Sequence, residues 1–445
     1  MNQLQPTPTT SAQTPDLPGD TDAPVHVERS HLRFPVVGIG ASAGGLAALT
    51  RFFEASPPTG GMAYVVILHL SPKHKSHAAE ILQRAAALPV EQVTESVTIE
   101  ADRVYVIPPA HQLAMTDGKL VLTADERIAG RHIAIDNFFR TLAHAHREHA
   151  VGVVLSGSGA DGAVGIARIK EQGGVTFVQT PDDAEHEDMP RAAIATGQAD
   201  FVLPAADMPE RLRTLVRTQR EIRLPADIAA ALKVALPGNA DEASRDEDAL
   251  RDVMQLLRVR TQHDFRAYKR ATVLRRLERR MQVTATTSLE SYRDYLREHP
   301  QETPALLQDM LISVTNFFRD RRAFEALERD VLPDLISRLP AEQPFRAWVP
   351  GCATGEEAYS VAMLVQEALQ GTEKAFQVFA TDIDDRALVK ARSGRYPGSV
   401  AGDMTPTRLR QFMQNDGNQC RVVKSLRDQV LFAHHNVLRD PPFSR

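Results

Sequence analysis

Residues 34–45 read FPVVGIGASAGG, an apolar run followed by a turn of small residues, after which a helical pattern begins at Leu46. Similar apolar runs recur up to residue 203, separated by segments whose apolar residues are spaced by three to four. Such alternation predicts an α/β fold of the doubly wound type, a mostly parallel sheet with helices on both faces. The predicted strands are Phe34–Ile39, Ala63–Leu68, Val104–Ile107, Val151–Leu155, Val175–Val178 and Phe201–Leu203.

Three side chains with catalytic chemistry follow the predicted strands. Ser42 lies in the glycine-rich turn after the first strand, His69 ends the second, and Asp161 follows Val151–Leu155 within the segment SGSGADG. Catalytic groups of open α/β sheets gather at the carboxyl ends of the strands. A histidine activates a serine hydroxyl, a carboxylate orients the histidine, and N–H groups of a glycine-rich turn stabilise an oxyanion. The pattern predicts a serine hydrolase site.

The same turn allows a second interpretation. From Gly38 to Gly44 the sequence nearly matches a dinucleotide-binding fingerprint, with its third glycine one position late. A nucleotide site of that type requires an acid at the tip of the second strand, where His69 stands instead. The hydrolase is favoured over the nucleotide site.

The rest of the chain divides by composition. Residues 1–33 are rich in Pro, Thr, Asp and Gln, and we expect a disordered tail because they contain too little apolar surface to fold. An α/β domain at 34–223 is followed by a Pro-punctuated linker at 224–248 and an all-helical domain at 249–340. A second α/β domain at 341–445 has predicted strands at Phe345–Val349, Gln377–Ala380 and Val430–Ala433.

The second α/β domain begins with a candidate cofactor loop. Its first strand leads into GCATGE, residues 351–356, and its second strand ends at Asp382. A glycine-rich first turn with an acid at the second strand tip is the geometry of a nucleoside cofactor site. Glu356 at a helix start favours a cationic ligand over a pyrophosphate, which points to S-adenosylmethionine. The alternative is an ordinary turn that binds no ligand.

A basic face is expected on a helix of the all-helical domain. In residues 268–281 an apolar stripe of Leu274, Leu277 and Met281 lies opposite a group of cationic side chains. That group is either a solvated surface or a docking face for an acidic partner. Its members are Lys269, Arg275, Arg276, Arg279 and Arg280.

Composition excludes several classes of protein. With 43% hydrophobic and 24% charged residues the balance is that of a globular protein, and a net charge of −5 gives no overall attraction for nucleic acid. Two distant cysteines provide neither a disulfide framework nor a metal knuckle, so no metal site is predicted. No run of 18 apolar residues occurs, so the protein is not expected to insert into a membrane and a cytoplasmic location is expected.

Four segments in order resemble the CheB-type protein-glutamate methylesterase family: VGIGASAGG at 37–45, LHLSP at 68–72, LSGSGADG at 155–162 and MPRAAIATG at 189–197. The resemblance implies hydrolysis of glutamate methyl esters on methyl-accepting chemoreceptors, without a cofactor. It assigns Ser42 as nucleophile, His69 as general base and Asp161 as the orienting acid. Ala43 and Ser158 depart from the residues usual in the family, Thr and Met.

The later segments 268–281, TNFFRD at 315–320, 351–360, ATDID at 380–384 and NVLRDPPF at 436–443 resemble the CheR-type chemoreceptor glutamate methyltransferase. The resemblance implies a small helical domain that docks receptors through its basic helix, and a Rossmann-like methyltransferase domain. Only three of about seven strands precede residue 445, so that domain is expected to be partial, and a longer chain to continue into sensor or kinase domains. The implied cofactor contacts are Thr315, Arg319, Glu356, Asp382, Asn436 and Val437.

The combined prediction is a chemoreceptor-modifying enzyme with opposing activities. Two alternatives remain: a receptor-binding signalling scaffold with impaired catalytic sites, and an unrelated serine hydrolase joined to a nucleoside-binding module.

Overall fold

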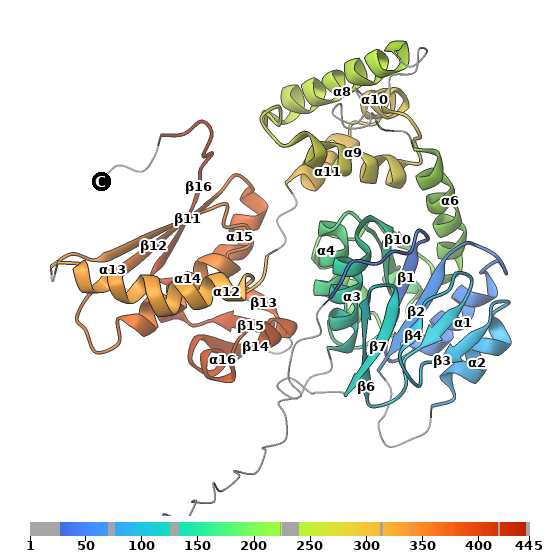
Figure 1. Cartoon of the computed structure of the whole chain (residues 1–445), viewed down its shortest axis with the longest axis horizontal. Coiled ribbons are helices and arrows are strands. Elements are labelled where there is room, and N and C mark those ends of the chain that lie inside the picture. The colour runs from blue at the N-terminus through green and yellow to red at the C-terminus, as the bar shows by residue number, and fades with distance from the viewer. Residues whose placement is uncertain are drawn as a thin grey trace, which may run out of the picture.

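The computed structural model describes residues 27–69, 76–124, 133–222, 224, 240–311, 315–340, 342–416 and 419–441. Three units follow one another along the chain (Figure 1). The N-terminal unit runs from β1 (Val36–Ala41) to α6 (Met208–Glu221), and the helical unit from α8 (Ala240–Thr261) to α11 (Glu302–Met310). The C-terminal unit runs from α12 (Arg321–Ala326) to β16 (Val430–His434). None of the helices described is long and apolar enough to cross a membrane.

The N-terminal unit is built on a seven-stranded sheet in the order β10-β9-β8-β1-β2-β5-β3, with every neighbouring pair parallel. Its central strands are continuous apolar runs because both faces of the sheet are covered. All six predicted strands are confirmed, and β3 is added at one edge. The bounds are β2 Ala63–Leu68, β3 Val90–Gln92, β5 Val104–Val106, β8 Ala150–Val154, β9 Val175–Gln179 and β10 Phe201–Leu203.

Helices cover the two faces of this sheet, as the doubly wound prediction requires. A Cβ at Gly40 would lie 2.3 Å from Cγ2 of Ile135, so the glycines of β1 allow helix α3 to approach closely on one face. Tyr64 of β2 lies on the opposite face and packs against Phe52 and Phe53 of α1. The helices are α1 Gly45–Glu54, α2 Ala78–Ala85, α3 Ala134–His146, α4 Ala163–Glu171 and α5 Asp188–Ala195.

Two parts of the N-terminal unit were not predicted. A separate antiparallel sheet contains β4 (Val97–Thr98), β7 (Lys119–Ala124) and β6 (His111–Thr116). Residues 27–33, placed in the disordered tail by composition, pack on the unit: the Ser30 amide donates to the Ala145 carbonyl at 2.8 Å. The prediction of disorder is therefore wrong for residues 27–33. A few apolar contacts suffice to hold a segment that adjoins a folded unit.

The helical unit is smaller than predicted. Helices α8, α9 (Arg270–Thr284), α10 (Leu289–Glu298) and α11 share one core around Leu257, Leu277 and Tyr292. Helix α13 (Leu332–Arg338) instead packs on α14 through Leu332, so the predicted helical domain, 249–340, is divided between two units. Helix α8 begins at Ala240, inside the predicted linker, whose residues 225–239 lie outside the described part of the chain.

The C-terminal unit contains a parallel sheet in the order β11-β12-β16, which confirms the three predicted strands. An antiparallel sheet, β13-β15-β14, forms a subdomain between α15 and β16. The main elements are β11 Phe345–Pro350, α14 Glu356–Ala368, β12 Phe376–Asp382 and α15 Asp385–Ser393. The subdomain contains β13 Arg395–Pro397, η5 Gly398–Asp403, α16 Pro406–Phe412, β14 Met413–Asp416, β15 Gln419–Val422 and α17 Lys424–Arg427.

Candidate active sites

The first candidate site lies where the strand order of the N-terminal sheet reverses, at the carboxyl ends of β1, β2 and β8. Ala41 is in register with Leu68, so Ser42 and His69 leave the sheet side by side. The Ser42 Oγ lies 3.2 Å from Nδ1 of His69, and the His69 Nε2 lies 2.8 Å from Oδ2 of Asp161. The structure therefore brings together all three residues of the predicted hydrolase site.

The carboxylate of Asp161 is buried and held by the backbone. It accepts N–H bonds from Ile135 at 3.0 Å and Asp136 at 2.9 Å, both in the first turn of α3, and from Gly162 at 3.0 Å. Its side chain is 4% exposed and lies at the N-terminal end of α3. Because an ionised carboxylate only accepts, Nε2 of His69 carries the ring proton and Nδ1 accepts from the Ser42 hydroxyl.

The turn after β1 presents backbone donors beside Ser42. The Ser42 amide donates to the Ser156 carbonyl at 2.9 Å, and Gly44 has a φ of 69°, which allows α1 to start at Gly45. Within the described part of the chain the amides of Ala43 and Gly44 donate to no protein group. N–H groups at a helix start, next to a nucleophile, suit a developing oxyanion.

Two neighbours of Ser42 were missed from the sequence. The Ser156 hydroxyl donates to the Ala43 carbonyl and accepts from the His186 amide, both at 2.9 Å, which braces the turn. A Cβ at Gly157 would lie 2.1 Å from the Met189 sulfur and 2.9 Å from Cβ of Ser42. The segments SGSG and MPRAA carried the signal, but only the tertiary structure shows their contact.

The second candidate site is the turn between β11 and α14. Glycines with positive φ begin and end this turn, Gly351 at 68° and Gly355 at 95°. Glu356 is buried, and burial raises the pKa of its carboxyl, which accepts a bond of 2.5 Å from the Thr354 hydroxyl. The Asp382 carboxylate at the tip of β12 accepts N–H bonds from Ala353 at 2.8 Å and from Asp384 at 2.9 Å.

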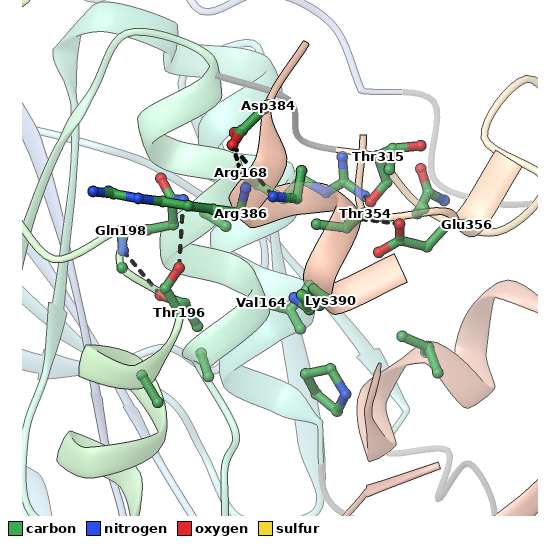
Figure 2. Close-up of a pocket in the computed structure, with 18 of the residues that line it drawn as sticks. Val164, Arg168, Thr196, Gln198, Thr315, Thr354, Glu356, Asp384, Arg386 and Lys390 are labelled. Carbon is green, nitrogen blue, oxygen red and sulfur yellow. Dashed lines mark hydrogen bonds between the residues drawn. The ribbon is translucent and has the colours of Figure 1, made fainter. Parts of the chain in front are cut away.

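A cavity of about 570 Å³ lies beside this turn, between the N-terminal and C-terminal units (Figure 2). Thr315, Thr354 and Glu356 are among its lining residues. Arg168 of α4 and Thr196, which follows α5, also line it. A wall of the cavity is therefore made by the N-terminal unit.

The remaining predicted contacts are more scattered. Asp382 is in register with His434, so Asn436, just beyond β16, stays near the turn; its Oδ1 accepts from the Leu438 amide at 3.0 Å. Val437 is 57% exposed. Arg319 lies outside the cavity and pairs with Glu171 of α4 at 2.5 Å. Thr315 and Glu356 thus both line the cavity, while the other four predicted contacts are not among its lining residues.

The residues at the second site fit S-adenosylmethionine. Among the described residues the buried Glu356 carboxylate accepts a side-chain hydrogen bond only from Thr354, and burial raises the pKa of its carboxyl although the charges of Lys390 and Arg168 lower it. A buried carboxylate favours a cationic ligand such as a sulfonium. No group of three or more metal-ligating side chains occurs among the described residues.

The basic helix α9 does not present the predicted docking face. Arg276 is buried and donates to the Glu171 carbonyl at 3.0 Å, at the C-terminal end of α4. Arg279 is buried between Asp200 of the N-terminal unit and Asp309 of α11. Arg280 pairs with Glu302 through two hydrogen bonds. Of the five predicted residues, the exposed one is Lys269 and the partly exposed one is Arg275.

Comparisons with known proteins agree with this division of the chain. A family model described as CheB methylesterase matches residues 37–212. The all-alpha domain of CheR methyltransferase matches residues 248–311, and its SAM binding domain matches residues 313–445. The boundary between the two CheR models lies before α12, where the structure also divides the predicted helical domain.

An uncharacterized 104.1 kDa protein of Rhodobacter capsulatus is 36% identical over 82% of this chain and 40% of its own length. A putative protein-glutamate methylesterase/protein-glutamine glutaminase of Leptospira interrogans is 31% identical over 43% of this chain and 100% of its length. The Pyrococcus abyssi protein-glutamate methylesterase/protein-glutamine glutaminase is 33% identical over 42% of this chain and 51% of its length.

This chain therefore spans less than half of the Rhodobacter protein and about half of the Pyrococcus one. The solved CheB methylesterase catalytic domain of Thermotoga maritima is 28% identical over 42% of this chain and 100% of its own, with a TM-score of 0.40. The chain belongs to the CheB methylesterase family, and its methylesterase domain is followed by the all-alpha and SAM-binding domains of a CheR methyltransferase.

Proposed function

We propose that the N-terminal unit hydrolyses glutamate methyl esters on chemoreceptors, with Ser42 as nucleophile. The observation that carries this proposal is the chain of hydrogen bonds from Ser42 through His69 to Asp161. Nδ1 of His69 takes the hydroxyl proton as Oγ attacks the ester carbonyl, and the Asp161 carboxylate stabilises the resulting imidazolium. The carbonyl oxygen gains negative charge next to the amides of Ala43 and Gly44.

The second half of the reaction restores the enzyme. His69 returns the proton to the departing methoxide, so methanol leaves and the glutamyl group remains esterified to Ser42. Water then attacks this ester with His69 as base, which releases the glutamate carboxylate and regenerates the Ser42 hydroxyl. In each step the proton passes to or from Nδ1 of His69, while the Asp161 carboxylate holds the imidazole in place.

The C-terminal unit is proposed to methylate receptor glutamates. S-adenosylmethionine supplies an electrophilic methyl group when bound. The Glu356 carboxylate would offset its positive charge, and the Asp382 carboxylate would accept from its ribose hydroxyls. The other proposed contacts are Thr315, Arg319, Asn436 and Val437, as the family resemblance implies.

The proposed partners are methyl-accepting chemoreceptors, and the proposed location is the cytoplasm. Cys352 and Cys420 are buried thiols, and the pKa of Cys352 is raised to about 12 by burial and by Asp382. Two free cysteines accord with a reducing compartment.

The proposal is tested by methanol release from a methylated receptor fragment. Ser42→Ala abolishes release, whereas Ser158→Ala, which removes an exposed serine from the loop after β8, retains it. Equal release by Ser42→Ala and the unmodified chain refutes Ser42 as the nucleophile, and no release by either protein refutes the esterase and leaves the scaffold alternative. Calorimetry with S-adenosylhomocysteine tests the proposed methyltransferase site separately. A measurable heat of binding supports a cofactor site in the C-terminal unit, and no heat of binding refutes a cofactor site in this chain.

A further inference from the structure

The C-terminal end of helix α4 contacts both CheR-type units. Arg276 of α9 donates to the carbonyls of Lys170 and Glu171 in the last turn of α4, and the Lys170 carbonyl also accepts from the Gly173 amide at 3.0 Å. Arg168 donates to the Thr315 carbonyl at 3.0 Å, and the Glu171 carboxylate pairs with Arg319 at 2.5 Å. One helix of the esterase domain thus holds two residues of the proposed cofactor site.

The chemistry of Arg319 limits what it binds in a cofactor. A guanidinium is a permanent cation that only donates, and it prefers carboxylates. In S-adenosylmethionine and S-adenosylhomocysteine the anionic group is the carboxylate of the amino-acid moiety. The Arg319 side chain is 51% exposed and its partner Glu171 is 13% exposed, so the pair lies at the edge of the domain interface. Glu171 therefore offers Arg319 the same functional group that the cofactor would.

We propose that Glu171 competes with the carboxylate of the cofactor for Arg319, so that the esterase domain weakens cofactor binding by the methyltransferase domain. This inference rests on the proposed cofactor site. Neutralising Glu171 while keeping its shape removes the competitor and tightens binding. The gain is bounded because Arg319 is half exposed: a partly exposed ion pair corresponds to at most about a fivefold change in affinity.

Calorimetric titration of the full chain tests the competition. S-adenosylhomocysteine is expected to bind Glu171→Gln about two- to fivefold more tightly than the unmodified chain. 5′-Methylthioadenosine, which lacks the amino-acid moiety, is expected to bind both proteins equally. The matched control is Glu210→Gln, which removes an equal charge from an exposed site on α6 where Glu210 pairs with Arg213.

The outcomes separate the inference from the function on which it rests. Tighter binding of S-adenosylhomocysteine alone, in Glu171→Gln alone, supports the competition. Unchanged or weaker binding by Glu171→Gln overturns it, and so does an equal gain with 5′-methylthioadenosine, because the effect then does not involve the carboxylate. If no protein binds either ligand, the cofactor site itself is refuted, and the inference with it.

Discussion

Asp161 and Glu171 lie near opposite ends of helix α4, and each holds a residue of a different proposed active site. Asp161 precedes the helix and accepts from His69 at 2.8 Å; Glu171 is its last residue and pairs with Arg319 at 2.5 Å. The esterase site and the methyltransferase domain are therefore connected by a single short helix. Helix α4 therefore holds residues of two proposed active sites whose proposed activities oppose each other.

Asp161→Asn is expected to lower the rate of ester hydrolysis by about 10³- to 10⁴-fold with little change in substrate affinity. The amide is neutral, so it neither stabilises an imidazolium nor fixes the proton on Nε2 of His69. Methanol release at saturating substrate measures the effect. A decrease of less than tenfold would show that Asp161 does not orient the base.

Gly157→Ala is expected to affect both stability and rate. The added Cβ meets the Met189 sulfur and Cβ of Ser42, so overpacking costs about 1–3 kcal/mol and displacement of the nucleophile slows hydrolysis by about 10²-fold. The double variant Gly157→Ala/Met189→Ala removes the contact of the added Cβ with the Met189 sulfur, but not its contact with Cβ of Ser42. A double variant that regains the full rate would contradict the proposed close contact between Gly157 and Ser42.

Arg279→Met is expected to destabilise the chain by about 3–5 kcal/mol, measured by chemical denaturation. Arg279 is buried between two carboxylates, and the charges of Arg279 and Lys170 lower the pKa of Asp200 although burial alone would raise it. The substitution leaves those carboxylates buried without this partner. As a control, Arg329→Met removes an exposed arginine and leaves the midpoint unchanged. Equal midpoints for both variants would contradict the role of Arg279.

Glu356 is expected to make cofactor affinity depend on pH. Burial raises the pKa of its carboxyl, so the folded protein holds this proton to a higher pH than the unfolded chain does. Ionisation of Glu356 therefore lowers stability as the pH rises from the unfolded pKa through the folded pKa, by the linkage of protonation to folding.

Over the same pH range a cationic cofactor binds more tightly, because its partner becomes charged. Calorimetry with S-adenosylmethionine at several pH values measures this, and Glu356→Gln is expected to bind weakly without the dependence. Glu357→Gln, at the exposed neighbouring position, is expected to retain it. If the affinity of Glu356→Gln for S-adenosylmethionine depended on pH as that of the unmodified chain does, the dependence would come from another group.

The sheet and the triad could be predicted because their signals are local. The central strands of the N-terminal sheet are continuous apolar runs, and parallel strands bring their carboxyl ends to one edge, so residues as distant as Ser42 and Asp161 could be placed together. One residue decided between a dinucleotide site and a hydrolase site at the glycine-rich turn. His69 stands at the end of the second strand, where a dinucleotide site requires an acid. The contact of Gly157 with Met189 could not be predicted, since it depends on how two loops pack.

Helix α9 shows where sequence periodicity fails. The spacing of Arg276, Arg279 and Arg280 identifies a shared face but not what covers it. In the structure that face lies against the esterase domain and helix α11: Arg276 donates to backbone carbonyls of α4, and Arg279 and Arg280 pair with carboxylates of the chain. The position of α13 was missed for the same reason: its helical pattern is clear, while its partner, α14, lies in another predicted domain.

The central claim is that Ser42 and His69 act as one catalytic unit. Rates of methanol release from a methylated receptor fragment by Ser42→Ala, His69→Ala and the double variant test it most directly. Residues that act as a unit are not additive, so all three variants are predicted to share the same residual rate. A double variant slower than either single variant, by the product of their separate losses, would show that the two side chains act independently and would contradict the proposed mechanism.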